Sequence, residues 1–410
     1  MKHLLSSLIL CIAFQGLSAR AETPSSPTAD RSKLVESNNA FAVDLYGQLR
    51  TQSGNLFFSP VGVSTALAMT YAGARGETAS EMAKTLHFTL PPGRLDLAMG
   101  ALLSDFNATH VAYRLRVANA LWVQRDFRIL DGFLKQNKTD YGTALFRVDF
   151  KGTTEATRLT INRWVDQKTE DKVKDLLQAG VLSSDARLLL TDAIYFKSDW
   201  QTQFRKDETK DGEFILSPIR QVIAPMMHQS GRFNYLEGDT FRALELPYER
   251  SEVSLLVFLP NRYDGLSDFE RSLNASNVRQ WLSQLRPVPK VILALPRFKI
   301  NQEFELRETL GTMGMRTAFS QSTANFSGIS GDRKLFLSAI IHKTFVELNE
   351  EGTEAAAASE VFGVAGMIGL GGVAEEPPIP FTVDHPFIFL IRDNHSGSIL
   401  FMGRVADPTK

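Results

Sequence analysis

A run of small residues near the C-terminal end places the strongest constraint on how this 410-residue chain folds. Residues 350–359 read Glu-Glu-Gly-Thr-Glu-Ala-Ala-Ala-Ala-Ser. The residues before them, 343–350, alternate apolar and polar side chains, which predicts a strand. Downstream, Pro377, Pro378 and Pro380 prevent a regular element. A small-residue segment between a strand and a run of prolines favours movement or cleavage over a fixed place in the fold.

Side-chain alternation separates the charges of this segment from its uncharged residues. In steps of two, one set contains only uncharged side chains, namely Thr353, Ala355, Ala357, Ser359, Val361, Gly363 and Ala365. The interleaved set contains both charges, Glu354 and Glu360. Because a strand places alternate side chains on opposite faces, the segment could enter a sheet with its uncharged face on a core and its glutamates in water. The alternative, from these residues alone, is a flexible Ala/Gly linker.

The start of the chain predicts export. Residues 1–21 have a short polar front, an apolar stretch too short to span a bilayer, and the sequence Ala19-Arg20-Ala21 before the expected cleavage point. We therefore expect a cleaved signal peptide, a secreted or periplasmic protein, and no membrane span. The single cysteine, Cys11, lies inside this signal, so the mature chain has no disulfide. That fits a bacterial envelope or secreted protein better than a typical animal one.

The remaining sequence predicts one large domain and a monomer. Residues 22–33 are polar and rich in proline and serine, which predicts a disordered leader, and residues 34–410 contain no linker or repeat. With 43% hydrophobic residues the chain can bury a large core. Helical spacing occurs at residues 34–49, 61–71, 77–86, 154–172 and 306–313. Strand-like runs occur at residues 113–123, 188–196, 253–259, 290–295, 338–350 and 388–392. Because most helical segments come early in the chain and most strand-like runs come late, the order predicts an α+β fold with antiparallel sheets.

The residue patterns of common enzymes and of nucleic-acid-binding proteins are missing. The seven histidines form no His-x-x-x-His pair and no cysteine is left to join them, so we expect no metal site and no cofactor. No Gly-x-Ser-x-Gly, Ser-x-x-Lys or phosphate-loop motif occurs. Residues 369–374 match a Gly-x-Gly-x-x-Ala dinucleotide pattern, but prolines follow where a helix is required. A formal net charge of −1 offers no basic field for nucleic acid.

A series of motifs carries a family resemblance. They are Asn55-Leu-Phe-Phe-Ser59-Pro60, Asn162-x-Trp164-Val165, Ala193-Ile-Tyr-Phe-Lys-x-x-Trp200, Pro225-Met-Met227, Glu245-Leu-Pro247-Tyr248, Leu295-Pro296-Arg-Phe298, Leu310-Gly-x-Met-Gly314-Met315, residues 338–342, Glu351-Gly-Thr-Glu-Ala-Ala, Asp384-His-Pro-Phe387 and Ile399-Leu-Phe-Met-Gly403-Arg. Their order and spacing over residues 34–408 resemble those of the serpins. The resemblance implies three β-sheets, about nine helices and an exposed reactive-centre loop at about residues 350–380.

The resemblance also implies a suicide-substrate mechanism and the residues that serve it. A protease attacks the loop and forms an acyl-enzyme, and the cut loop then inserts into the central sheet and distorts the tethered protease. The implied hinge consists of Glu351, Gly352, Thr353, Glu354, Ala355, Ala356, Ala357, Ala358 and Ser359. Family spacing places the reactive bond between Gly366 and Met367. Ala365 and Leu370 are rivals, because this loop is longer than usual.

The resemblance assigns a second group of residues to the sheet that opens. Ser59 and His342 match a polar cluster beneath the middle of that sheet, and Trp200 matches an aromatic residue at the top of the insertion site. Without the resemblance, all three are ordinary core residues. The chain departs from the family by having Asp192 where Asn is usual and Gly62 where Ser is usual, so an Asp192–His342 pair would be ionisable.

The loop composition indicates the target. No Lys or Arg occurs between Lys343 and Arg392, so we expect an extracellular serine protease of elastase-, subtilisin- or chymotrypsin-like preference rather than a trypsin-like one. A papain-like cysteine protease is an alternative target. A non-inhibitory serpin, acting as a chaperone or ligand carrier, is the alternative function. Such members typically have bulky residues, charges or proline in the hinge, and this hinge has small residues, so we favour an inhibitor over the alternatives and over any enzyme.

Overall fold

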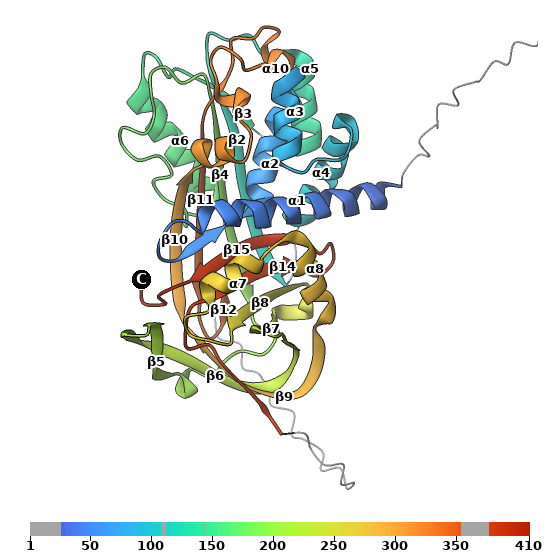
Figure 1. Cartoon of the computed structure of the whole chain (residues 1–410). Coiled ribbons are helices and arrows are strands. Elements are labelled where there is room, and N and C mark those ends of the chain that lie inside the picture. The colour runs from blue at the N-terminus through green and yellow to red at the C-terminus, as the bar shows by residue number, and fades with distance from the viewer. Residues whose placement is uncertain (1–25, 109–111, 143, 354–376) are drawn as a thin grey trace, which may run out of the picture.

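The computed structural model describes residues 26–108, 112–142, 144–353 and 377–410 (Figure 1). Its helices are α1 (Pro27–Leu49), α2 (Pro60–Tyr71), α3 (Gly76–Thr85), α4 (Pro92–Asn107), α5 (Asp131–Gln136), α6 (Thr154–Lys168), α7 (Leu266–Ser272), α8 (Ala275–Gln284), α9 (Arg307–Thr312) and α10 (Ser327–Ser330). Short π or 3-10 turns are η1 (Asn137–Tyr141), η2 (Lys206–Glu208), η3 (Glu249–Ser251) and η4 (Thr317–Phe319). All five helices predicted from spacing are present.

Most of the remaining described chain is strand. The strands are β1 (Leu56–Phe58), β2 (Tyr113–Gln124), β3 (Ala144–Val148), β4 (Leu188–Asp199), β5 (Lys210–Ser217), β6 (Arg220–Glu237), β7 (Phe241–Pro247), β8 (Val253–Pro260), β9 (Arg286–Pro296), β10 (Phe298–Glu305), β11 (Leu337–Leu348), β12 (Gly352–Thr353), β13 (Ile379–Thr382), β14 (Phe387–Asp393) and β15 (Ile399–Val405). Each predicted strand is present, and the α+β class is confirmed.

The described strands form two hydrogen-bonded sheets where three were expected. A six-stranded sheet has the order β10-β11-β12-β4-β2-β3. A nine-stranded sheet has the order β1-β15-β14-β8-β7-β6-β9-β13, with β5 on β6. The 18-residue strand β6 pairs with β5 along its first part, with β9 from Met226 to Tyr235, and with β7 at its end. It thereby joins two of the expected sheets into one continuous hydrogen-bonded network.

Helix α1 begins earlier than expected, so the predicted leader at residues 22–33 is wrong where the structure describes it. The Ser26 hydroxyl oxygen accepts a hydrogen bond from the Ala29 N–H at 3.3 Å, and Pro27 occupies the first turn. Asp30 accepts a hydrogen bond from Nε of Arg94 on α4 at 2.8 Å. The serine and proline that suggested disorder act here as helix-start signals.

The core has two parts, one on each side of the six-stranded sheet. The larger part contains α2, whose residues are all buried, and the inner faces of both sheets. Ser59 caps this helix, its hydroxyl accepting a hydrogen bond from the Gly62 N–H at 3.2 Å. The smaller part lies beneath α6, where the Trp122 ring stacks on Phe146 with centroids 4.4 Å apart. In Figure 1 the six-stranded sheet follows the long axis, with α2 to α5 in the upper half and the nine-stranded sheet below.

Candidate functional site

The six-stranded sheet has a central seam where β4 and β11 run parallel and side by side. Their pairing extends from Leu188 opposite Leu337 to Tyr195 opposite Phe345. At the end of this pairing, β12 lies between the two strands and pairs antiparallel with both. Extension of β12 beyond Thr353 would therefore separate β4 from β11 along the seam.

Ser59, Asp192 and His342 lie together behind the middle of this seam. All three side chains are fully buried. The Ser59 N–H donates to Nε2 of His342 at 3.0 Å, and the Ser59 hydroxyl donates to the Leu400 carbonyl at 2.7 Å. Because Nε2 accepts a hydrogen bond, the ring proton lies on Nδ1, which is 2.7 Å from Oδ2 of Asp192. The two atoms are close, but their contact is not aligned as a hydrogen bond.

The two departures from the family pattern, Gly62 and Asp192, are neighbours in space. A Cβ atom on Gly62 would lie 2.7 Å from Oδ2 of Asp192 and 2.8 Å from Oδ1. The Gly62 carbonyl accepts a hydrogen bond from Nδ2 of Asn119 at 3.3 Å, and Asn119 stands opposite Asp192 on β2. The missing side chain at position 62 therefore leaves the space that the Asp192 carboxylate fills. The sequence indicated both departures but not that they touch.

Gly352, the first residue of β12, is required for close approach of two backbones. A Cβ atom at this position would lie 2.1 Å from the Ser198 carbonyl oxygen and 2.7 Å from the Asp199 Cα. Its φ of +156° is also one that residues with side chains rarely adopt. The resemblance assigned Gly352 to the hinge, and the structure gives a steric reason for glycine at this position.

Thr353 is fully buried, at the end of the described part of the hinge. Its hydroxyl lies 2.6 Å from the hydroxyl of Tyr248, which follows β7. The Tyr248 ring stacks on Trp200, with centroids 4.4 Å apart and an interplanar angle of 7°. Trp200 therefore lies beside the entry to the seam.

A tight turn joins β11 to β12. The Asn349 N–H donates to the Gly352 carbonyl at 2.9 Å, and Oδ1 of Asn349 accepts from the N–H groups of Glu351 and Gly352 at 3.0 and 3.2 Å. Nε1 of Trp200 donates to the Asn349 carbonyl at 2.8 Å. This turn reverses the chain, so that β12 runs back along β11 and enters the seam from its end.

Ion pairs hold the end of β11 and this turn to their surroundings. Glu350 is buried and accepts hydrogen bonds from Arg297 and Thr209. Burial alone would raise the pKa of Glu350, but these hydrogen bonds outweigh it and hold the pKa below its usual value. Two further pairs, Lys206 with Glu351 and Lys299 with Glu347, lie beside it.

The reactive-bond candidates and most of the hinge lie outside the described residues. They are Glu354, Ala355, Ala356, Ala357, Ala358, Ser359, Ala365, Gly366, Met367 and Leu370. The chain is described again from residue 377, and β13 pairs parallel with β9. The Asp384 carbonyl then accepts a hydrogen bond from the Ile215 N–H of β5 at 2.7 Å. The described chain therefore belongs to a sheet shortly before and shortly after residues 354–376.

This site also contains four residues that were not predicted from the sequence. Tyr248, Asn349, Arg297 and Thr209 contact the hinge or the turn before it. Tyr248 and Arg297 each belong to a motif that carried the resemblance, which was the signal available to identify them. Asn349 lies two positions before the expected hinge, whereas Thr209 gave no signal.

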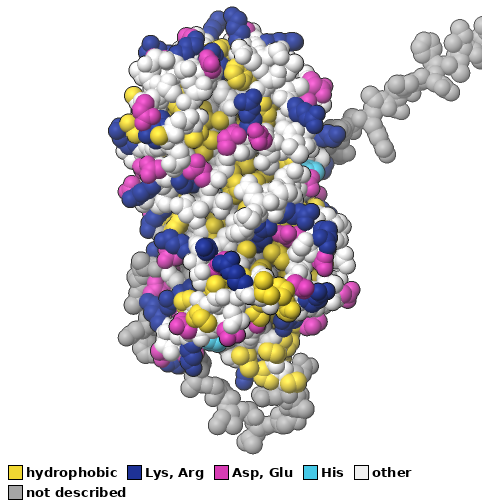
Figure 2. Space-filling view, turned by 60° about the vertical axis from the view of Figure 1, so that its left-hand side comes forward, with side chains coloured by type: hydrophobic (Ala, Val, Ile, Leu, Met, Phe, Trp, Pro, Cys, Tyr) yellow, Lys and Arg dark blue, Asp and Glu magenta, His cyan; other side chains and the backbone are white. Residues whose placement is uncertain are grey.

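The described residues hold no group of three His, Cys, Asp or Glu side chains that could bind a metal ion. Among the described helices, none combines the length and apolar character needed to cross a membrane. Figure 2 shows acidic and basic side chains interspersed over the face it presents.

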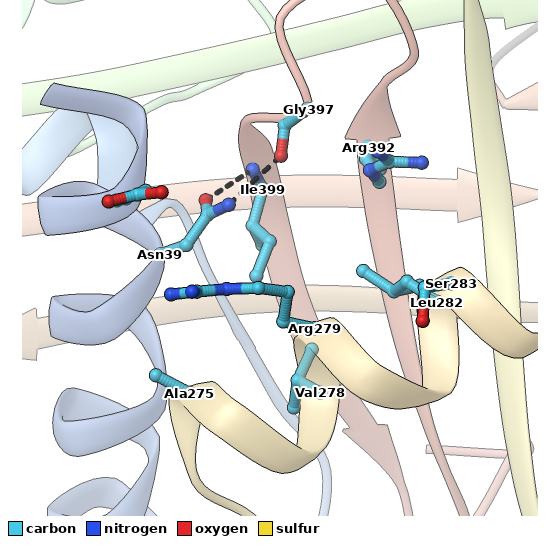
Figure 3. A pocket seen from close by; sticks show the side chains of 10 residues that line it. Asn39, Ala275, Val278, Arg279, Leu282, Ser283, Arg392, Gly397 and Ile399 are labelled. Carbon is cyan, nitrogen blue, oxygen red and sulfur yellow. Dashed lines mark hydrogen bonds between the residues drawn. The ribbon is translucent and has the colours of Figure 1, made fainter. Parts of the chain in front are cut away.

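A separate pocket lies away from the seam, between α1, α8 and the β14–β15 hairpin (Figure 3). Its volume is about 260 Å³, and Val278, Leu282 and Ile399 contribute apolar walls. Asn39 closes one side, donating to the Gly397 carbonyl and accepting from the Ile399 N–H, both at 2.9 Å. None of the described residues of the predicted hinge or polar cluster lines this pocket.

Comparison with known proteins gives one consistent family. The family model described as Serpin (serine protease inhibitor) matches residues 36–408. Human leukocyte elastase inhibitor is 38% identical over 385 residues, covering 92% of this chain and all of the relative. Among solved structures, human thyroxine-binding globulin superimposes with a TM-score of 0.83 at 30% identity, over 94% of this chain and all of that one. Serpin48 of the insect Tenebrio molitor superimposes with a TM-score of 0.81 at 32% identity, over 92% of this chain and 98% of that one.

These matches cover almost the whole domain expected from the sequence, and they confirm the α+β fold that the motifs implied. The matched family is described as one of serine protease inhibitors and not of enzymes, in agreement with the catalytic motifs missing from the sequence. The chain therefore belongs to the serpin family.

Proposed function

We propose that this chain is a suicide-substrate inhibitor of an elastase-like serine protease, which it traps by inserting its cleaved reactive-centre loop between β4 and β11. The observation that carries this proposal is β12. It lies between the two parallel strands, it is buried, and its last described residue, Thr353, belongs to the small-residue segment. Insertion would extend a strand that is already started.

The chemistry of trapping requires one covalent step. The protease serine attacks the carbonyl carbon of the scissile bond, the C–N bond breaks, and the new amino terminus leaves with the C-terminal piece. The N-terminal piece stays esterified to the serine. Because this piece is continuous with Thr353, each further residue that enters the seam pulls the ester, and the protease with it, along the sheet.

Every second side chain of the loop from Thr353 to Ala365 is uncharged, and this pattern supports insertion rather than simple cleavage. Residues 355, 357 and 359 share the face of Thr353 in an extended chain, and all are small. Thr353 faces the core side of the seam, where it meets Tyr248. A dozen new strand residues at ~0.5–1.5 kcal/mol per hydrogen bond would contribute on the order of 10 kcal/mol, enough to make insertion effectively irreversible.

Two observations support an elastase-like target. The loop contains no Lys or Arg, which a trypsin-like protease needs, and small or apolar residues surround Gly366 and Met367. The human relative is named for elastase inhibition. Subtilisin-like and chymotrypsin-like proteases share this preference, and a papain-like cysteine protease is the cross-class alternative.

We also propose that the protein acts as a monomer outside the cytoplasm, after removal of residues 1–21. The apolar stretch and the Ala19-Arg20-Ala21 site support export. The relatives reported above are animal proteins, so the bacterial type expected from cysteine usage stays a prediction.

Incubation of the protein with elastase, subtilisin, chymotrypsin and papain tests the proposal. Denaturing electrophoresis should show a stable complex with at least one serine protease, and the mass of the released C-terminal peptide should identify the bond near Gly366. Cleavage by every serine protease without a stable complex would contradict inhibition. It would favour the non-inhibitory alternative, a chaperone or ligand carrier.

A further inference from the structure

We propose that Tyr248 is a positioning residue for loop insertion, and that it sets the register of the inserting strand by holding the hydroxyl of Thr353. This inference rests on the proposed function. It starts from a contact between two fully buried side chains, in which the phenol oxygen of Tyr248 lies 2.6 Å from Oγ1 of Thr353.

The Tyr248 ring cannot follow a shifting partner, because aromatic rings hold it on two sides. Trp200 stacks on it at 4.4 Å and nearly parallel. Phe196 of β4 meets it edge-on, with centroids 5.4 Å apart and an interplanar angle of 75°. Trp200 is itself held by its hydrogen bond to the Asn349 carbonyl. The phenol is therefore a fixed point at the entry to the seam.

Burial keeps the Tyr248 hydroxyl protonated and therefore uncharged. The pKa of the Tyr248 phenol is raised well above its usual value, because burial penalises the phenolate. The hydroxyl therefore stays protonated at neutral pH, and as a buried group it requires a hydrogen-bond partner. Thr353 supplies that partner in the structure.

A one-residue slip of β12 would remove this partner. Side chains alternate between faces, so a slip in one direction would bring the position of Gly352 to the phenol, and a slip in the other would bring that of Glu354. Glycine offers no hydroxyl, and an ionised glutamate would enter a site that solvent does not reach. Only the observed register, with Thr353 opposite Leu348 and Ser198, satisfies both hydroxyl groups.

The same register is the one that insertion needs. With Thr353 facing Tyr248, residues 355, 357 and 359 follow on the inward face, and Glu354 and Glu360 stay on the outward face. A strand that starts out of register would carry both glutamates inward and would stall. Stalled insertion gives the protease time to hydrolyse the acyl-enzyme, so the inhibitor would be consumed as a substrate.

The test is a double-mutant cycle of Tyr248→Phe and Thr353→Val, read as moles of inhibitor consumed per mole of elastase inhibited. Each single substitution leaves one buried hydroxyl without its partner, and we expect the ratio to rise by about five-fold or more. The double variant leaves neither hydroxyl, so its ratio should fall back towards that of wild type. Thr353→Ser retains a hydroxyl and should stay within about two-fold of wild type.

Tyr46→Phe is the matched control. Tyr46 is fully buried and donates a 2.6 Å hydrogen bond to Glu270, as Tyr248 bonds to Thr353, but it lies on α1 away from the seam. Its loss should lower thermal stability and leave the consumption ratio unchanged. An equal rise for Tyr46→Phe would overturn the inference, because the effect would then reflect general instability.

Two other results would also overturn the inference, and they are distinguishable. If both single variants had the same consumption ratio as wild type, the role of Tyr248 would be refuted and the proposed function would remain intact. A wild-type protein that traps no protease in the panel would refute the proposed function, and the inference with it.

Discussion

Nδ1 of His342 lies 2.7 Å from Oδ2 of Asp192, at a point behind the seam that solvent does not reach. The Ser59 N–H fixes the tautomer by donating to Nε2, so the ring is neutral and faces the carboxylate with its one N–H. A buried carboxylate with a neutral and poorly aligned partner is costly. The seam therefore carries an unfavourable contact at the point that must open.

Asp192→Asn tests this cost. The amide keeps the size of the side chain and removes its charge, so we expect the free energy of unfolding at pH 7 to rise by about 1–2 kcal/mol. Chemical denaturation measures the change. A loss of stability in Asp192→Asn would mean that the carboxylate is better satisfied than the geometry indicates.

Gly62→Ser tests whether the missing side chain accommodates Asp192. The added Cβ would lie 2.7 Å from Oδ2, so we expect a loss of about 1–3 kcal/mol in stability from overpacking. Combination with Asp192→Ala should recover much of that loss, since the obstructing atoms are then gone. Gly47→Ser on α1 is the control, because a Cβ there meets nothing within 4 Å. Additive effects of the two substitutions would contradict the pairing.

Glu350→Gln tests the ion pair before the hinge. Because the pKa of Glu350 is lower in the folded protein than its ordinary 4.5, the carboxylate stabilises the fold above that pH, and the contribution is lost as pH falls through the folded pKa. We expect Glu350→Gln to lower stability by about 1.5–3 kcal/mol at pH 7, with the difference from wild type shrinking below pH 4.5.

Denaturation at a series of pH values measures this difference, and Glu347→Gln is its control. Glu347 pairs with Lys299 at 3.5 Å, and both side chains are exposed, so the loss should stay within about 0.5 kcal/mol. A wild-type to Glu350→Gln difference that is constant from pH 7 to pH 3 would rule out the titration of Glu350 as its cause.

Thr353→Arg tests burial of the hinge. Thr353 is already fully buried between β4 and β11, so an arginine there would place an unpaired charge in the entry to the seam, and the variant should be cleaved as a substrate and form little or no complex. Complex yield on denaturing gels measures this, with Thr353→Ser as the conservative comparison. Wild-type yield from Thr353→Arg would show that Thr353 is not buried when the protease is trapped.

The sequence predicted the elements of this site better than their contacts. Apolar and polar side chains alternate over residues 338–350, where β11 forms, and residues 61–71 have helical spacing, where α2 forms. Both elements could be predicted because a local pattern of side chains determines each of them. The leader at 22–33 was wrong in part because Ser26 and Pro27, read as disorder signals, start a helix. Tyr248 and Thr353 are 105 residues apart, and Arg297 and Glu350 are 53 apart, so no local pattern could pair them.

The thermal unfolding midpoint before and after a single cut within residues 354–376 tests the central claim most directly. If the cut loop extends β12 into the seam, the new strand pairs with β4 and β11, and the midpoint should rise by about 10 °C or more. An unchanged or lower midpoint in the cleaved protein would show that the loop stays outside the sheet, and it would contradict inhibition by insertion.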